Sequence, residues 1–166
     1  MGFEALYDNA SVRRRDRLLS AEEAAGVLRR GEYGFLAMQD AGDGAYGVPI
    51  SYVWDGGSRI YLHCAPEGRK QSCLERHPEV TFCVVGATHV VGRKFTTAYE
   101  SVILRCRAVV GPDEEERWKA PDLLLCKYAP EHAETGPLYA ETAFPRPQTI
   151  RLDTRPARGT ATRTSE

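Results

Sequence analysis

Two adjacent cations, Arg69 and Lys70, lie where the sequence changes from a strand pattern to a helix pattern. Residues 58–65 alternate apolar and polar side chains, as a half-buried strand does, and Pro66 suits the first position of a helix over 66–76. Free N–H groups and the positive end of the helix dipole make two cations unfavourable there unless an anion binds among them. The pattern therefore predicts either a phosphate site or two solvated surface cations.

Other patterns that resemble catalytic or metal motifs lack the context that such motifs need. Cys73 and His77 are four residues apart with no second ligand pair, so we predict no metal site. Residues 42–47 fit G-x-G-x-x-G, but a predicted strand follows them where a dinucleotide site requires a helix. His63 is the side chain near the two cations whose charge can change close to neutral pH.

The composition is that of an ordinary soluble domain. The chain has 166 residues, of which 42% are hydrophobic and 27% charged, and its net charge is −1. A dedicated nucleic-acid binder would usually be basic, and no apolar run approaches the roughly 18 residues of a membrane span. The N-terminal segment has no apolar stretch of secretory type, and the five cysteines form no C-x-x-C pair. We expect a cytoplasmic protein with reduced thiols, and neither nucleic acid nor membrane as a partner.

Hydrophobic periodicity predicts a mainly β protein with peripheral helices. We expect strands over 33–38, 46–54, 58–65, 80–85, 99–110 and 147–153, and a loop over 86–97. Besides 66–76, we expect helices over 21–30 and 113–119, with Pro121 interrupting or kinking the latter before 123–128. Tight turns between consecutive strands favour an antiparallel sheet closed into a small barrel. Pro49 cannot donate a ladder hydrogen bond, so its strand should have a free edge, a bulge or a ligand beside it.

The predicted domain covers residues 20–153 and begins with a capping box formed by Ser20 and Glu23. Residues 1–19 form a polar arm whose basic cluster consists of Arg13, Arg14, Arg15 and Arg17. The cluster could contact nucleic acid, but we prefer a solvated arm that packs on the domain or on a partner subunit. Residues 154–166 carry almost no apolar side chain, and we expect them to be a disordered tail.

Three segments carry a resemblance to a known family. They are Tyr46–Trp54, Ile60–Lys70 and Thr97–Ile103, which contain the patterns G-V-P-x-x-Y, H-x-A-x-E-G-x-K and Y-x-S-V-I in this order. Over roughly residues 13–153, the chain closely resembles the pyridoxamine 5′-phosphate oxidase-like, FMN-binding split-barrel superfamily. Within that superfamily it is most similar to the nitroimidazole-resistance (Nim-type) flavoproteins.

The resemblance implies a six-stranded antiparallel split β-barrel that forms a homodimer, with one FMN in each of two clefts at the interface. The implied cofactor-binding residues are Val48, Pro49, Ile50 and Ser51 along the isoalloxazine ring; His63, Cys64 and Ala65 near the ribityl and phosphate part; Arg69 and Lys70 on the phosphate; and Tyr99, Glu100 and Ser101 from the other subunit. His63 is the expected catalytic residue, contacting substrate or flavin; the alternative is a strand histidine that only forms a hydrogen bond.

The implied activity is an FMN-dependent oxidoreductase that transfers a hydride or two electrons from reduced FMN to a small aromatic or nitroaromatic acceptor. True pyridoxamine phosphate oxidases have an Arg-x-His motif near the C-terminus, where this chain has Arg151-Leu152-Asp153, so we do not expect vitamin B6 oxidation. Split barrels also hold haem or the deazaflavin F420, and the alternative is a non-catalytic binding or sensing protein. Arg69 and Lys70 favour a phosphorylated ligand over haem.

Overall fold

A computed structural model describes residues 2–10, 12–40, 42, 44–132 and 148–162 of the chain. Its centre is a closed antiparallel barrel with the strand order β1-β2-β3-β6-β5-β4. The strands are β1 (Tyr33–Gln39), β2 (Ala45–Trp54), β3 (Arg59–Cys64), β4 (Glu79–Val91), β5 (Thr96–Val110) and β6 (Gln148–Thr162). The predicted fold class, a mainly β protein built on a six-stranded antiparallel barrel, is confirmed.

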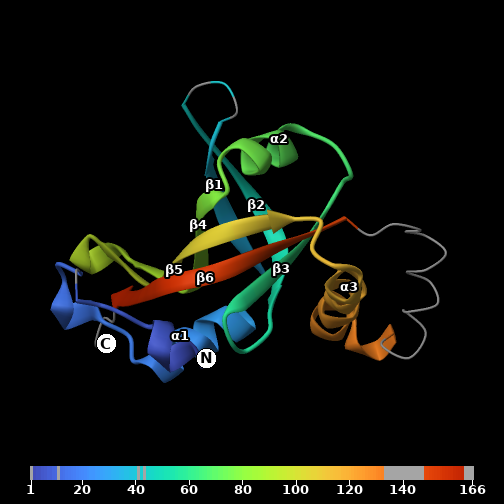
Figure 1. Ribbon diagram of the computed structural model, residues 1–166. Coiled ribbons are helices and arrows are strands. Elements are labelled where there is room, and N and C mark those ends of the chain that lie inside the picture. The colour runs from blue at the N-terminus through green and yellow to red at the C-terminus, as the bar shows by residue number, and fades with distance from the viewer. Residues whose placement is uncertain (1, 11, 41, 43, 133–147, 163–166) are drawn as a thin grey trace.

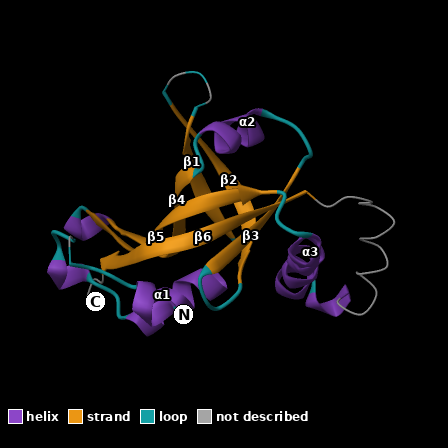
Figure 2. Ribbon diagram, viewed as in Figure 1, coloured by secondary structure: helices purple, strands orange, loops and turns teal. Residues whose placement is uncertain are grey.

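Three α-helices lie at different places around the barrel (Figures 1 and 2). They are α1 (Ala21–Arg30), α2 (Arg69–Arg76) and α3 (Glu114–Tyr128), and short 3-10 turns occur at η1 (Phe3–Leu6), η2 (Arg15–Arg17), η3 (Gly92–Lys94) and η4 (Pro130–His132). In the described parts of the chain, no helix has both the length and the apolar character needed to cross a membrane.

Helix α1 begins with the predicted capping box. The Ser20 hydroxyl accepts the Glu23 N–H at 3.1 Å, and the Glu23 carboxylate accepts the Ser20 N–H at 2.7 Å. The helix packs on the barrel through Ala24, Val27 and Leu28, which are fully buried. Inward-facing residues of every strand complete one continuous hydrophobic core.

The chain beyond residue 153 corrects the sequence prediction. Residues 154–162 form the second half of β6 and pair with β5 as far as Tyr99 and Thr162, so the prediction of a disordered tail is wrong for them; residues 163–166 lie outside the described residues. The N-terminal arm packs against this strand. The Tyr7 hydroxyl donates to the Leu19 carbonyl at 2.8 Å, and the Leu19 N–H donates to the Gly159 carbonyl at 3.2 Å. Residues 154–162 are therefore held in place by backbone pairing with β5 and by the N-terminal arm, and not by apolar side chains of their own.

Two further predictions are wrong. The range 86–97 is mostly strand, because β4 and β5 continue as a hairpin past a bulge between Val85 and Thr88. Helix α3 is continuous through Pro121, so of the two predicted alternatives the interruption is the one that is wrong. Proline cannot donate to the Arg117 carbonyl four residues earlier, and the Thr149 hydroxyl of β6 lies 3.5 Å from that carbonyl instead.

Candidate functional site

Strand β2 separates from β3 halfway along its length. Only 52–54 pair with β3, while 45–51, here called the split edge, pair with β1 alone. The free edge that Pro49 predicted is therefore confirmed. Pro49 and Ser51 are exposed on the outer face, and Val48 and Ile50 are half-buried against the core. The split edge thus presents backbone and small side chains to the outside.

The edge of β3 that faces away from β2 pairs with β6 over the whole length of β3. His63 and Cys64 are the register partners of Thr149 and Gln148. The Cys64 thiol is buried and lies 3.7 Å from the Gln148 carbonyl, whereas His63 and Ala65 are exposed. Of the predicted site residues on this strand, His63 is therefore the one with a polar side chain accessible to a ligand.

Helix α2 begins at Arg69, so the prediction that Pro66 opens it is wrong. Gly68 precedes it with φ 143°, a conformation that a helix cannot include and that favours glycine. Arg69 and Lys70 lie in the first turn, as predicted, which contains no acidic residue, and no side chain caps it. The first N–H groups of α2 are therefore without a capping partner within the described residues.

Lys70 lies close to the end of β3. Partial burial lowers the pKa of His63, and the positive charge of Lys70 lowers it further. Burial raises the pKa of the Cys64 thiol, and Lys70 opposes this increase. Within the described part of the chain, Lys70 forms no ion pair with a carboxylate. An imidazole, an ammonium and the start of a helix therefore meet at one place, which suits an anion.

Arg69 is held by a residue that the sequence analysis did not select. Its guanidinium donates to both carboxylate oxygens of Asp40, at 2.6 and 3.3 Å, and lies 4.4 Å from the centre of the Tyr46 ring. This ion pair raises the pKa of Arg69. Asp40 is 29 positions away in the sequence, and no local pattern indicates the contact. The ion pair attaches α2 to the residue that follows β1, and the Tyr46 ring is the contact of Arg69 with the split edge.

The third group of predicted residues lies elsewhere on the chain. Tyr99, Glu100 and Ser101 are on β5, and β1 and β4 separate them from the split edge. The Glu100 carboxylate accepts from Arg30 at 2.6 Å and from the Ala87 N–H at 3.3 Å. A single chain therefore does not bring these residues to the site at the split edge.

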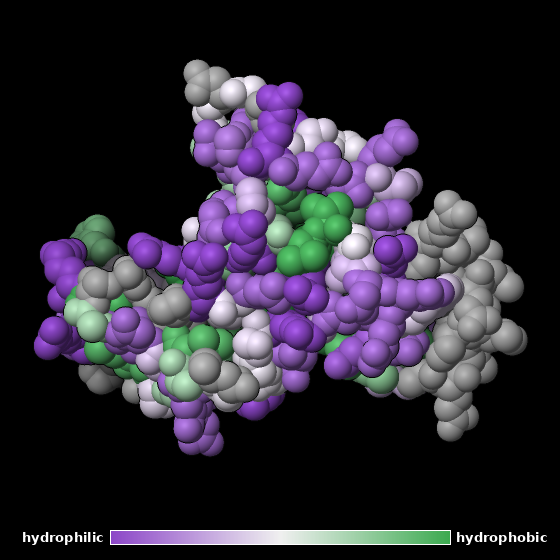
Figure 3. Space-filling model, viewed as in Figure 1, coloured by the Kyte–Doolittle hydropathy of each residue, from purple (hydrophilic) through white to green (hydrophobic). Residues whose placement is uncertain are grey.

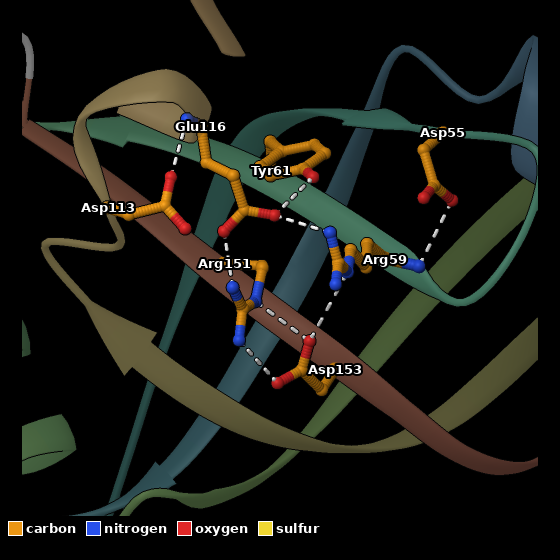
Figure 4. Close-up of polar contacts among 7 residues, drawn as sticks. All are labelled: Asp55, Arg59, Tyr61, Asp113, Glu116, Arg151 and Asp153. Carbon is orange, nitrogen blue, oxygen red and sulfur yellow. Dashed lines mark hydrogen bonds and ion pairs between the residues drawn. The ribbon is translucent and has the colours of Figure 1, made fainter. Parts of the chain in front are cut away.

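A network of charges at the opposite end of β3 attaches α3 to the barrel (Figure 4). The buried carboxylate of Glu116 accepts from Arg59 at 2.5 Å, from Tyr61 at 3.2 Å and from Arg151. Arg151 also binds Asp153 at 2.8 Å, and these two carboxylates raise the pKa of its guanidinium. Arg151 therefore links β6 to the first turn of α3, and Asp153 holds the Arg151 guanidinium in position.

Several solved structures are similar to the chain. One is a candidate 5-nitroimidazole antibiotic resistance protein from Bacteroides thetaiotaomicron, with 19% identity, a TM-score of 0.70, and coverage of 84% of this chain and 82% of its own. A FAD-binding protein from Mesorhizobium loti has 23% identity, a TM-score of 0.59, and coverage of 89% and 98%. A FAD- and haem-binding protein from Mycobacterium smegmatis has 15% identity, a TM-score of 0.70, and coverage of 87% and 72%. At these identities the similarity establishes the fold.

A search of curated proteins found no match. The sequence profile described as pyridoxamine 5′-phosphate oxidase matches residues 20–161, which include α1, α2, α3 and nearly the whole barrel. The resemblance inferred from the sequence motifs is thereby confirmed. The chain belongs to the pyridoxamine 5′-phosphate oxidase family.

Proposed function

We propose that the chain is an FMN-dependent oxidoreductase that reduces small aromatic or nitroaromatic acceptors such as nitroimidazoles. The observation that carries this proposal is the position of Lys70, at the uncapped start of α2 and beside His63, next to the split edge. Family membership supports it, as do similar structures named for FAD binding and for 5-nitroimidazole resistance.

The residues present fit a flavin phosphate. Lys70 and the first N–H groups of α2 supply positive charge without an internal carboxylate, while Arg69 would share its guanidinium with Asp40. Pro49 and Ser51 leave the split edge open to a flat ring. FMN, when bound, supplies reversible two-electron chemistry. The lowered pKa of His63 favours neutral imidazole, which can donate one hydrogen bond and accept another beside the ring.

The expected reaction balances with a reduced nicotinamide as electron donor. The donor gives up a hydride and becomes the oxidised nicotinamide, one proton is taken up from the solvent, and the nitro group loses one oxygen as water to become a nitroso group. The chain's own part is to hold the flavin and acceptor in contact and to limit access of bulk water.

A second copy of the chain would complete the site. Register partners place Pro49, Phe35, Cys83 and Ile103 in one row across β2, β1, β4 and β5, and Phe35 and Ile103 are 47% and 45% exposed. Figure 3 shows that the surface over β5 and β6 is otherwise largely hydrophilic, with a hydrophobic patch below α2. A homodimer that covers this apolar row would bring Ser101, two residues from Ile103, toward the split edge of the partner.

A visible absorption spectrum of the protein after loading with FMN and desalting tests the cofactor. Retained bands near roughly 370 and 450 nm support it, and a protein that cannot hold FMN overturns it. Turnover of a nitroimidazole with a reduced nicotinamide then tests the reaction. Ser101→Trp should disrupt the dimer and the retained flavin together; if both persist, the interface assignment is wrong.

The alternative is a non-catalytic protein that binds haem, flavin or F420 on the same fold. The name of the Mycobacterium smegmatis neighbour, a FAD- and haem-binding protein, supports the flavin and haem parts of this alternative. A Soret-type band in place of the flavin bands would identify haem. Tight flavin binding without any turnover would identify a binding or sensing protein.

A further inference from the structure

A second hollow, of 510 Å³, opens between the start of β1, the split edge and the C-terminal end of α3. Arg29, Arg30, Tyr33, Ser51, Lys127 and Tyr128 line it. Its volume is in the range of small-molecule sites. None of these residues except Ser51 belongs to the flavin site proposed above, so the hollow needs its own explanation.

Lys127 is fixed in this hollow without a carboxylate partner among the described residues. Its Nζ donates to the Tyr52 carbonyl at 2.9 Å and lies 3.6 Å from the centre of the Tyr52 ring. An ammonium has three N–H donors; one goes to this carbonyl and one can face the ring, so at least one remains for a ligand. Burial lowers the pKa of Lys127 to about 8. A positioned and partly desolvated cation attracts an anion more strongly than an exposed one does.

Two arginines add positive charge, and one carboxylate offsets part of it. The Arg29 guanidinium lies 5.2 Å from the centre of the Trp54 ring and forms no ion pair within the described residues. Arg30 is matched by Glu100 at 2.6 Å. Glu32 is the carboxylate of the lining. With Lys127 protonated, the hollow therefore has a positive balance, supplied by Arg29 and Lys127.

The remaining walls are aromatic. The Tyr128 hydroxyl accepts the Tyr52 N–H at 3.0 Å and donates to the Glu32 carbonyl, so this ring is held in place at 41% exposure. Tyr33 is 61% exposed and is the register partner of Ser51 on the neighbouring strand. Two partly exposed rings beside a positive hollow suit a flat ligand that carries a negative charge.

We propose that this hollow binds a planar aromatic carboxylate, with the carboxylate at Lys127 and Arg29 and the ring against Tyr33 and Tyr128. Ser51 belongs to both the hollow and the split edge, so the far end of the ligand lies beside the proposed flavin ring. The identification of this ligand as the electron acceptor rests on the proposed function. Binding of the carboxylate itself does not.

Isothermal titration calorimetry of the full chain, with and without FMN, tests the proposal. The probes are 4-nitrobenzoate and 4-nitrobenzamide, which share the ring and the nitro group and differ in charge. We expect the acid to bind about tenfold or more tightly than the amide. Lys127→Met should weaken binding of the acid by about tenfold and change that of the amide by less than about twofold. Lys119→Met, an exposed lysine on the same helix, is the matched control and should change neither.

Arg29→Gln gives a second test if Lys127→Met does not fold, and it should weaken the acid selectively. Equal affinity for acid and amide, or unchanged affinity of the acid in both variants, overturns the proposal. If inorganic phosphate binds the hollow as tightly as 4-nitrobenzoate does, the part of the proposal that concerns the aromatic ring is wrong. Selective acid binding by a chain that never retains FMN would uphold the hollow and refute the proposed function.

Discussion

The two ends of β3 carry charged side chains in opposite arrangements. Beneath α3, the Glu116 carboxylate is matched by Arg59 and Arg151. At the other end, Lys70 lies beside uncapped N–H groups with no carboxylate partner in the described part of the chain. Buried charges need partners inside the protein, whereas an unmatched cation at a helix start is available to an external anion. The first arrangement holds a helix in place; the second is suited to recognition.

Removing the charge of Glu116 should give the largest effect on stability. Glu116→Gln leaves Arg151 and Arg59 without their buried partner, so we expect the free energy of unfolding to fall by about 2–3 kcal/mol. This is less than for a fully buried pair because Arg59 is 44% exposed. Chemical denaturation measures it, and Glu115→Gln, at the exposed neighbouring position, is the control. Equal free energies of unfolding for the two variants would contradict the structural role of Glu116.

Lys70→Ala should weaken ligand binding and leave the stability of the protein unchanged, in contrast to Glu116→Gln. The affinity for FMN should fall by about 10–100-fold, because a charge-assisted phosphate contact is lost, while the melting temperature of the flavin-free protein stays the same. Fluorescence titration with FMN measures the affinity, and Lys119→Ala is the control. Wild-type affinity in the Lys70 variant would contradict the phosphate assignment.

Lys127 lies near the C-terminal end of α3, whereas Glu116 lies near its start, and the charge of Lys127 depends on pH in the range that can be measured. Burial lowers its pKa from 10.5 to about 8, so its ammonium is present below pH 8 and lost above it. Binding of 4-nitrobenzoate should therefore weaken as pH rises through about 8, and stability should rise between about 8 and 10.5, because the unfolded chain then binds more protons. The charged and titratable groups that face it are Arg29, Arg30, Glu32, Tyr52 and Tyr128.

The same titration on Lys127→Met assigns the transition. If the variant keeps a transition near pH 8, another group is responsible for it. If the variant binds the acid weakly and independently of pH, the transition belongs to Lys127.

The smallest effect is expected at Asp40, whose ion pair joins a mostly buried carboxylate to the 58% exposed side chain of Arg69. Asp40→Asn removes a carboxylate next to the proposed phosphate and frees the guanidinium, so FMN should bind about two- to fivefold more tightly. The melting temperature should change little, because the Arg69 end of the pair is solvated and the amide keeps the size of the side chain. Weaker FMN binding would instead show that Asp40 positions Arg69.

The sequence predicted the features that depend on local patterns. The capping box at Ser20, the alternation of β3 and the free edge at Pro49 each follow from neighbouring residues. Lys70 lies near His63 because one short connection joins β3 to α2, and Arg69 of α2 contacts the Tyr46 ring of the split edge.

The remaining features depend on contacts between distant residues. Asp40 and Arg69 are 29 positions apart, and Glu116 and Arg59 are 57 apart, so no local motif pairs them. Residues 154–162 carry almost no apolar side chain and form a strand because β5 offers a backbone ladder. Pro121 remains inside α3, where the Thr149 hydroxyl of a separate strand lies near the carbonyl that the proline cannot satisfy.

The position of β6 has a consequence for synthesis of the protein. It is the last strand along the chain, yet it lies between β3 and β5 and pairs with both. On the ribosome, the earlier strands must therefore wait as an open sheet with two unpaired edges until this segment emerges. Such edges invite pairing between nascent chains. Slow translation of the segment that encodes β6, or a chaperone that shields β3 and β5, would therefore affect the yield of this protein more than its final stability.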